Sequence, residues 1–186
     1  MWVAAGCRAK TSSAPEPKAS ESKPRPPAGR LAETPPAKVP ISALKLGVGD
    51  PAPPITLTLH DGSTVDLGEP TDRWVLVYFY PKDDTPGCTV EAQGFRDRFP
   101  DLESSRVTVI GVSLQDASSH AAFIDKYELP FPLAVDDGSA AAAFGVPVRG
   151  EFAARQSFLL RGGKVREVWR TVDPARHPAE VLAAVK

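Results

Sequence analysis

Cysteine is scarce in this sequence, since only Cys7 and Cys88 occur among its 186 residues. Two cysteines exclude a disulfide-dense scaffold and a zinc site built from cysteine thiolates. The three histidines, His60, His120 and His177, lie far apart in the chain, so we expect neither a histidine-built metal site nor a bound cofactor. No apolar run is long enough for a transmembrane helix, and none is predicted.

An excess of one charge sign is also missing, because 22 basic side chains face 23 acidic ones and the formal net charge is −1. The balance hides an asymmetry. Residues 1–45 carry eight basic and three acidic groups, whereas residues 46–186 carry fourteen basic and twenty acidic groups. A folded part with a negative net charge disfavours polyanions. We therefore expect no nucleic-acid partner.

Residues 1–45 do not have the composition of a folded domain. Eight of the twenty prolines fall before residue 41, and no aromatic residue occurs between Trp2 and Trp74. Such a segment buries too little apolar surface to offset the entropy lost on ordering. We expect a disordered, partly polyproline-like arm over residues 1–45, followed by one globular domain over residues 46–186.

Residues 4–7, Ala-Ala-Gly-Cys, resemble the cleavage box of a bacterial lipoprotein, in which the cysteine is lipidated. The six residues before Cys7 cannot supply both the basic region and the apolar stretch that a signal peptide needs. Two interpretations stay open: either the native start lies upstream of Met1, or Cys7 is an incidental thiol. A lipidated Cys7 would imply a periplasmic, membrane-tethered protein, whereas a free Cys7 is compatible with a cytoplasmic one.

After residue 46, predicted strands alternate with predicted helices. Residues 55–59 alternate apolar side chains with threonines, and Asp61-Gly62 predicts a hairpin turn after them. The expected strands cover residues 55–59, 65–67, 74–80, 106–113, 131–135, 156–161 and 164–170, and the expected helices cover residues 85–99, 118–128, 136–145 and 178–186. This order predicts an α/β fold that ends in a hairpin and a helix.

Several polar residues of the domain are assigned to ordinary structural positions. On the helix over residues 85–99, the side chains expected to face the core are Val90, Phe95 and Phe99, and those expected to face solvent are Glu91, Arg96 and Asp97. Asp83 and Asp84 are predicted to form a solvated pair in the preceding loop. His120 and His177 are predicted to lie at the starts of helices.

Cys88 lies where a buried strand gives way to a helix. It follows the strand over residues 74–80 across a loop rich in proline and glycine, and it falls in the first helical turn. The free N–H groups and partial positive charge of a helix N-terminus favour a thiolate over a thiol. The alternative is an inert core residue, since free cysteine is often buried. Pro81 and Thr85 complete a Pro-x-x-x-Thr-x-x-Cys spacing.

This spacing and its surroundings resemble the peroxiredoxins, specifically the bacterioferritin comigratory protein or peroxiredoxin Q group. The similar stretch runs from Val75 to Ala92, with further similarity at residues 49–53 and 155–160. The resemblance implies a thioredoxin-like fold with a central mixed β-sheet flanked by helices, preceded by the disordered arm. It also implies a thiol-dependent peroxidase that reduces hydrogen peroxide and organic hydroperoxides through a sulfenic acid, without metal, haem or flavin.

Carried over residue by residue, the resemblance implies four catalytic positions. Cys88 corresponds to the peroxidatic cysteine, Thr85 and Pro81 to its companions, and Arg155 to the arginine that contacts the active site. Without the resemblance, Arg155 would be interpreted as a solvated cation at the end of a strand. The implied partners are peroxide substrates and a thiol reductant, and we expect a monomer or a weak dimer.

The sequence departs from this group five residues after Cys88, where many members have a resolving cysteine and this chain has Gln93. Cys7 is the other thiol of the chain, and a flexible arm would give it only a modest effective concentration at Cys88. We therefore expect a one-cysteine mechanism. In it, thioredoxin, glutaredoxin or a small external thiol reduces the sulfenic acid of Cys88.

Other classes of function use related features. A thiol–disulfide oxidoreductase needs a Cys-x-x-Cys pair, which the positions around Cys88 do not supply. A copper-handling or assembly factor needs Cys-x-x-x-Cys, and Ala92 stands where its second cysteine would be. A non-catalytic or redox-sensing interaction module that keeps the fold is the remaining alternative. The joint presence of Pro81, Thr85, Cys88 and Arg155 favours the peroxidase.

Overall fold

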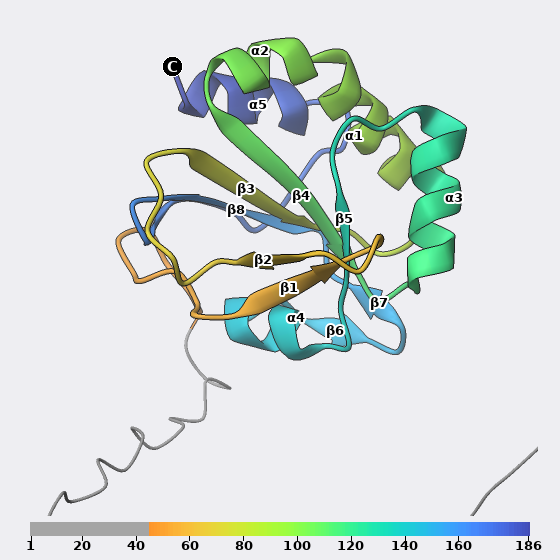
Figure 1. Cartoon of the computed structure of the whole chain (residues 1–186), viewed down its shortest axis with the longest axis horizontal. Helices are drawn as coiled ribbons and strands as arrows, with labels where there is room; N and C mark the ends of the chain where they lie inside the picture. The colour runs from red at the N-terminus through yellow and green to blue at the C-terminus, as the bar shows by residue number, and fades with distance from the viewer. Residues whose placement is uncertain (1–44) are drawn as a thin grey trace, which may run out of the picture. The chain divides into compact units, whose positions relative to one another are not determined.

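A mixed sheet of seven strands forms the centre of the part of the chain that the computed structural model describes, residues 45–186 (Figure 1). The expected arm, apart from Lys45, lies outside the described residues. The strands of the sheet are β1 (Thr56–Leu59), β2 (Thr64–Asp66), β3 (Trp74–Phe79), β4 (Val107–Ser113), β5 (Leu133–Val135), β8 (Gln156–Arg161) and β9 (Lys164–Trp169). Their order is β2-β1-β5-β4-β3-β8-β9, with β3, β4 and β5 parallel and the other neighbours antiparallel.

Helices cover both faces of this sheet (Figure 1). They are α1 (Pro86–Asp97), α2 (Phe99–Ser104), α3 (Ala117–Tyr127), α4 (Ser139–Phe144) and α5 (His177–Ala184). Side chains of α1, α2, α3 and α5 pack with one buried cluster, and side chains of α4 pack with the other. The predicted α/β class is therefore confirmed in the described residues.

Strand β3 connects the two buried clusters. Leu76, Tyr78 and Tyr80, the last just beyond the strand, join the cluster of α1, whereas Val77 and Phe79 join the cluster of α4. All five side chains are almost fully buried. Successive side chains of a strand point to opposite faces, so a continuous apolar run fits a strand that is covered on both sides. This confirms the central strand predicted from the sequence.

The prediction of a helix over residues 85–99 is confirmed except at its ends, and the short helix that follows it was not predicted. Helix α1 ends at Asp97, and the short helix α2 starts at Phe99 after a break at Arg98. Pro100 explains the break, because its nitrogen has no hydrogen to donate to the Arg96 carbonyl. In the new helix, Pro100 occupies the first turn, where no such bond is needed.

A small hairpin was not predicted either. Strands β6 (Val148–Arg149) and β7 (Phe152–Ala153) form a two-stranded hairpin between α4 and β8. Gly150 provides its turn with a φ of 60°, in the left-handed region that glycine adopts without strain. This hairpin leads directly into the segment that contains Arg155.

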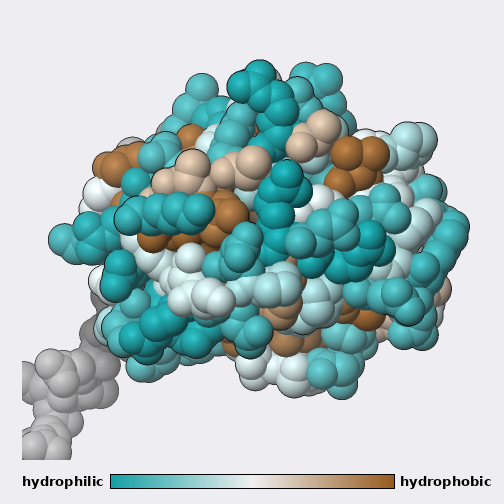
Figure 2. All heavy atoms as spheres, turned by 90° about the horizontal axis from the view of Figure 1, so that it is seen from above, coloured by the Kyte–Doolittle hydropathy of each residue, from teal (hydrophilic) through white to brown (hydrophobic). Residues whose placement is uncertain are grey.

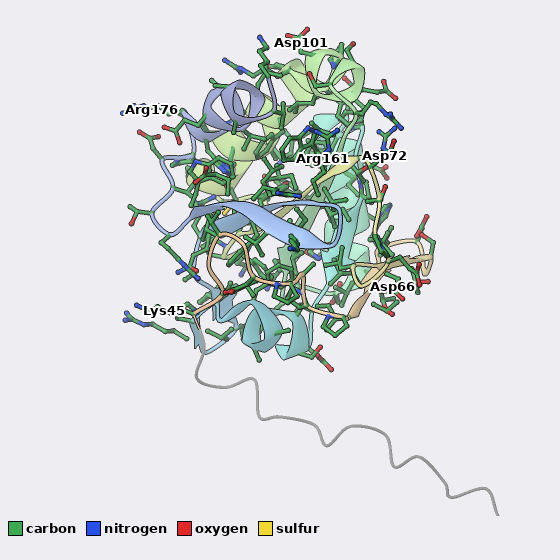
Figure 3. The ribbon with its side chains drawn as sticks, turned by 90° about the vertical axis from the view of Figure 1, so that its left-hand side faces the viewer. Lys45, Asp66, Asp72, Asp101, Arg161 and Arg176 are labelled. Atoms are coloured by element: carbon green, nitrogen blue, oxygen red, sulfur yellow. The ribbon has the colours of Figure 1, made fainter. Side chains whose placement is uncertain are left out.

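The surface of the described domain is mainly polar. Figure 2 shows the face that lies at the top of Figure 1. Hydrophilic side chains cover most of this face, and its hydrophobic areas are small and separate. At the sheet edge, Arg161 and Asp72 lie together (Figure 3), with Arg161 Nε donating to the Asp72 carbonyl oxygen at 3.1 Å. The Arg161 guanidinium also lies 4.8 Å from the centre of the Trp74 ring, so a cation covers part of Trp74, which also packs against the buried cluster of α1.

Candidate active site

Cys88 is the third residue of α1, which follows β3 after the loop over residues 80–85. Pro86 opens the helix with its fixed backbone angle, and Thr85 at the N-cap has the extended backbone typical of that position. The Thr89 N–H donates to the Thr85 carbonyl at 2.8 Å, so the N–H groups of Gly87 and Cys88 precede the first helical hydrogen bond. The Cys88 side chain is a free thiol and only 2% exposed.

Arg155 reaches Cys88 from the far end of the sequence. Its Nη2 lies 3.1 Å from Cys88 Sγ, and its side chain is 17% exposed. A Cβ on Gly87 would lie 3.3 Å from the same nitrogen, so glycine leaves room for the guanidinium. A cationic donor at this distance stabilises a thiolate more than a neutral thiol. Cys88 and Arg155 are therefore brought together as the resemblance implied.

Glu91 is the residue of this site that the sequence analysis missed. Its carboxylate is fully buried, with Oε2 accepting from Arg155 Nη1 and Oε1 lying 2.9 Å from His177 Nδ1. Burial opposes the charge of Arg155, but the nearby charges of Glu91 and Cys88 outweigh this effect and raise the pKa of Arg155 above its usual value.

The prediction that Glu91 faces solvent and Val90 faces the core was wrong for both residues. Val90 is 45% exposed, whereas the buried residues of α1 are Cys88, Glu91, Ala92 and Phe95. These four follow the three- and four-residue spacing of one helix face. The spacing from Cys88 was the available signal, but the carboxylate of Glu91 was taken as a mark of exposure.

Asp83 was also wrongly assigned to solvent. It is 7% exposed and accepts hydrogen bonds from Tyr80 Oη at 2.7 Å and Ser119 Oγ at 2.6 Å, with His120 Nδ1 at 2.9 Å. Burial opposes its charge, but these hydrogen bonds outweigh burial and lower the pKa of Asp83. Asp84 does face solvent, where it pairs with Lys126 at 2.6 Å.

The two histidines predicted at helix starts belong to these buried polar clusters. His177 is the first residue of α5, and His120 is the fourth residue of α3, where the Asp116 side chain caps the helix through the Ser119 N–H. Both rings are fully buried. The helix positions are therefore close to those predicted, but the sequence analysis gave no sign of their burial against Glu91 and Asp83.

Thr85 and Pro81 lie in the loop between β3 and α1, and both are partly buried. The Thr85 hydroxyl donates to the Lys82 carbonyl at 3.1 Å, so its proton is used within the loop. Tyr78 lies in the same buried cluster as Cys88, and burial raises the pKa of Tyr78 well above its usual value. Cys7 lies outside the described residues.

Residues 45–186 contain no group of three or more histidine, cysteine, aspartate or glutamate side chains that could hold a metal ion. In the same range, no helix is long and apolar enough to cross a membrane. What the site does offer is a buried sulfur at a helix start, a guanidinium in contact with it, and two adjacent backbone N–H groups. This arrangement can hold an anionic sulfur and stabilise negative charge that develops beside it.

Residues 48–168 match the AhpC/TSA family. The chain is 41% identical over 143 residues to the chloroplastic peroxiredoxin Q of Suaeda salsa, across 74% of this chain and 67% of the plant protein. The structure of Xanthomonas campestris bacterioferritin comigratory protein, studied for its alkyl peroxide reduction activity, is 33% identical with a TM-score of 0.68, covering 75% of this chain and 95% of that one.

A cysteine-to-serine mutant of Xylella fastidiosa peroxiredoxin Q is equally similar. It is 32% identical with a TM-score of 0.69, covering 74% of this chain and 94% of that chain. These similarities confirm the thioredoxin-like fold that the sequence resemblance implied.

Proposed function

Because this chain belongs to the AhpC/TSA family, we propose that Cys88 is the sulfur that reacts with peroxide. The protein is a peroxiredoxin, a thiol-dependent peroxidase. The observation that supports Cys88 most strongly is the 3.1 Å contact between its Sγ and Arg155 Nη2. A partly buried guanidinium that contacts a sulfur at a helix start favours the thiolate, which is the nucleophilic form.

The proposed reaction is a displacement at oxygen. The Cys88 thiolate attacks one peroxide oxygen, the S–O bond forms as the O–O bond breaks, and Cys88 becomes a sulfenic acid. The electron pair of the broken bond leaves with the second oxygen, which takes up a proton and departs as water or an alcohol. Donors aimed at the departing oxygen lower the barrier. Arg155 and the N–H groups of Gly87 and Cys88 are the stronger candidates, since the Thr85 proton is used by Lys82.

Hydrogen peroxide and organic hydroperoxides are the proposed substrates. The alkyl peroxide reduction activity of the Xanthomonas campestris relative supports the second class. The mechanism needs only a reactive sulfur and hydrogen-bond donors, so both classes can use the same residues. Thr85 and Pro81 are proposed to hold the loop that positions Cys88.

We propose a one-cysteine cycle because Gln93 replaces the resolving cysteine on α1. The sulfenic acid of Cys88 then has no thiol partner on its own helix. An external thiol, such as thioredoxin, glutaredoxin or a small thiol, attacks the sulfenic sulfur and releases water, and a second thiol reduces the resulting mixed disulfide. Cys88 is only 2% exposed, so a small movement of the loop must open the sulfur to that reductant.

Two single substitutions test this cycle. Cys88→Ser should abolish peroxide consumption with every reductant, and Cys7→Ser should leave most of the turnover intact. Both are assayed with hydrogen peroxide and tert-butyl hydroperoxide, using thioredoxin, glutaredoxin and glutathione in parallel. Activity that survives in Cys88→Ser would contradict the assignment of the sulfur. Activity that is lost in Cys7→Ser would contradict the one-cysteine cycle.

The remaining assignments concern the chain outside the site. Residues 46–186 are proposed to form the peroxidase domain and residues 1–45 a disordered arm, which would tether the protein to a membrane if Cys7 is lipidated. The domain is proposed to be a monomer or a weak dimer without a nucleic-acid partner. Mass spectrometry of the native N-terminus tests the tether, which an unmodified Cys7 would exclude. Sedimentation of the full chain tests the oligomeric state, and a stable larger oligomer would contradict the proposed monomer or weak dimer.

A further inference from the structure

His177 completes a continuous series of buried contacts that ends at the reactive sulfur. Its Nδ1 lies 2.9 Å from Glu91 Oε1, and the other carboxylate oxygen, Oε2, accepts from Arg155 Nη1. The second amino nitrogen of Arg155, Nη2, lies 3.1 Å from Cys88 Sγ. The imidazole and the carboxylate are both fully buried. The proposed reaction uses Arg155 and Cys88, but it gives no reason for a histidine behind the carboxylate.

The hydrogen-bond pattern assigns the proton on the His177 ring. A carboxylate can only accept, so Nδ1 carries the hydrogen that lies between the two groups. Nε2 is buried and has no hydrogen-bond partner among residues 45–186. The rings of Phe95 and Trp169 pack against the imidazole, each with its centre 5.3 Å away. These contacts favour a ring that donates a hydrogen bond from Nδ1 alone.

Other charges near α5 point away from this imidazole. Arg176, labelled in Figure 3, is 75% exposed and lies 3.8 Å from Glu180 on the same helix. On α1, Glu91 is the charged group that faces His177, and through Glu91 the ring is linked to Arg155. Tyr78 of β3 lies in the same cluster as Cys88 and stays protonated. The imidazole therefore acts on a single charged partner.

A close approach of two helices seats the ring over Glu91. A Cβ on Gly94 of α1 would lie 2.8 Å from Pro178 Cγ, nearer than real atoms allow. Glycine in the middle of a helix costs about 1 kcal/mol relative to alanine, so a structural reason is expected. The reason here is the contact with Pro178, the residue after His177. Gly94 lets α5 approach α1 closely enough for the imidazole to reach the carboxylate.

The energetic argument concerns the buried carboxylate. A buried anion is costly unless all its oxygens are hydrogen-bonded. Arg155 satisfies one oxygen of Glu91, and His177 satisfies the other. With both oxygens held, the carboxylate fixes Nη1 of the guanidinium, and Nη2 contacts the sulfur. Without the His177 donor, one oxygen of the buried Glu91 carboxylate would lose its hydrogen bond, and a rotation that finds it another donor would release Arg155.

We propose that His177 is a positioning residue of the peroxidase reaction, which acts through Glu91 to hold the Arg155 guanidinium against Cys88. This inference rests on the roles proposed above for Cys88 and Arg155. It predicts that the Nδ1–H group, and not the ring itself, is what the reaction requires. Asparagine can place an amide N–H near the position of Nδ1, whereas leucine fills similar space without a donor.

The test compares His177→Leu and His177→Asn in the full chain, with Glu180→Gln on the same helix as the matched control. Stopped-flow oxidation of Cys88 by hydrogen peroxide is measured across the pH range, and thermal unfolding reports the fold of each variant. His177→Leu should react about tenfold more slowly or worse, as expected when a charged group loses a hydrogen bond. His177→Asn should stay within about threefold of the wild type.

Each outcome decides the matter. A Leu variant with the wild-type rate and pH profile would overturn the proposal, and so would an Asn variant as slow as a folded Leu variant. If the Leu variant does not fold, the Asn variant decides together with heteronuclear NMR of the imidazole nitrogens. The wild-type ring must then be protonated at Nδ1 and bare at Nε2. If the wild-type Cys88 does not react with peroxide, the proposed function is overturned. The NMR measurement reports on the imidazole alone, so it distinguishes this failure from a failure of the role proposed for His177.

Discussion

Replacing Arg155 with methionine should slow the reaction of Cys88 with peroxide by about 10²–10³-fold, the usual loss when one donor to a developing oxyanion is removed. Methionine keeps an unbranched, flexible stem but offers no N–H group at the position 3.1 Å from Sγ. The assay is stopped-flow oxidation of Cys88 under an excess of hydrogen peroxide. The dependence of the observed rate on peroxide concentration gives the second-order rate constant.

The same substitution should also destabilise the fold. It leaves the fully buried Glu91 carboxylate without its cationic partner, and breaking a buried ion pair from one side typically costs about 3–5 kcal/mol. We expect about 3 kcal/mol, the lower end of this range, because the Arg155 side chain is 17% exposed and water can replace part of the lost interaction. Urea denaturation of the reduced protein measures the change in the free energy of unfolding.

The double variant Arg155→Met/Glu91→Gln separates the two effects. Glutamine removes the uncompensated charge but keeps an oxygen that accepts from His177, so most of the lost stability should return. The reaction rate should stay low, because the guanidinium is still missing. A single variant that keeps the wild-type rate, or a double variant that recovers it, would refute the assigned role of Arg155.

Three further substitutions test other parts of the account. Asp83→Asn should lower the unfolding temperature at neutral pH by weakening the buried bond to His120, at a cost of about 1–3 kcal/mol. Because the pKa of Asp83 is lowered, the stability that its carboxylate contributes is present above the usual carboxylate pKa and is lost as the pH falls through the lowered value. The unfolding temperatures of the wild type and the variant should therefore converge in acid, and a constant difference down to the acid limit would contradict this. Gly94→Ala should lower the free energy of unfolding in urea by about 1–3 kcal/mol, although alanine has the better helix propensity, because α5 must shift away from α1. A more stable variant would be inconsistent with the close approach of the two helices. Val90→Ser should change the stability by no more than about 0.5 kcal/mol, because Val90 is 45% exposed; a larger loss would mean that the buried face of α1 is wrongly assigned.

Local patterns were sufficient to predict most of the sheet and the start of the site. The continuous apolar run of β3, the turn at Asp61-Gly62 and the glycine pair between β8 and β9 each point to one backbone conformation. The start of α1 was predictable for the same reason, because Pro86 favours a first helical turn and places Cys88 within it.

The charged residues of the site could not be predicted in this way. Glu91 is buried because its partners, Arg155 and His177, come from segments 64 and 86 residues away in the sequence. A side chain type alone gives no sign of such partners, so a carboxylate on a helix is assigned to solvent by default. The burial of Asp83 against His120 has the same cause, since the two lie 37 positions apart in the sequence.

Cys88 and Arg155 differ from these residues because a resemblance, rather than a local pattern, brought them together. Arg155 taken alone fits a solvated strand-end cation equally well, and only the fold carries it to the sulfur. The hairpin of β6 and β7, which leads into Arg155, was invisible because two-residue strands have no readable alternation.

The most direct test of the central claim is to add one equivalent of hydrogen peroxide to the reduced full chain and trap the product with dimedone. Mass spectrometry then identifies the modified residue. If the account holds, Cys88 is rapidly and almost completely converted to the dimedone adduct of its sulfenic acid, and Arg155→Met slows this conversion. If Cys88 remains an unmodified thiol while the wild-type protein consumes peroxide, the sulfur at the start of α1 is not the reacting group.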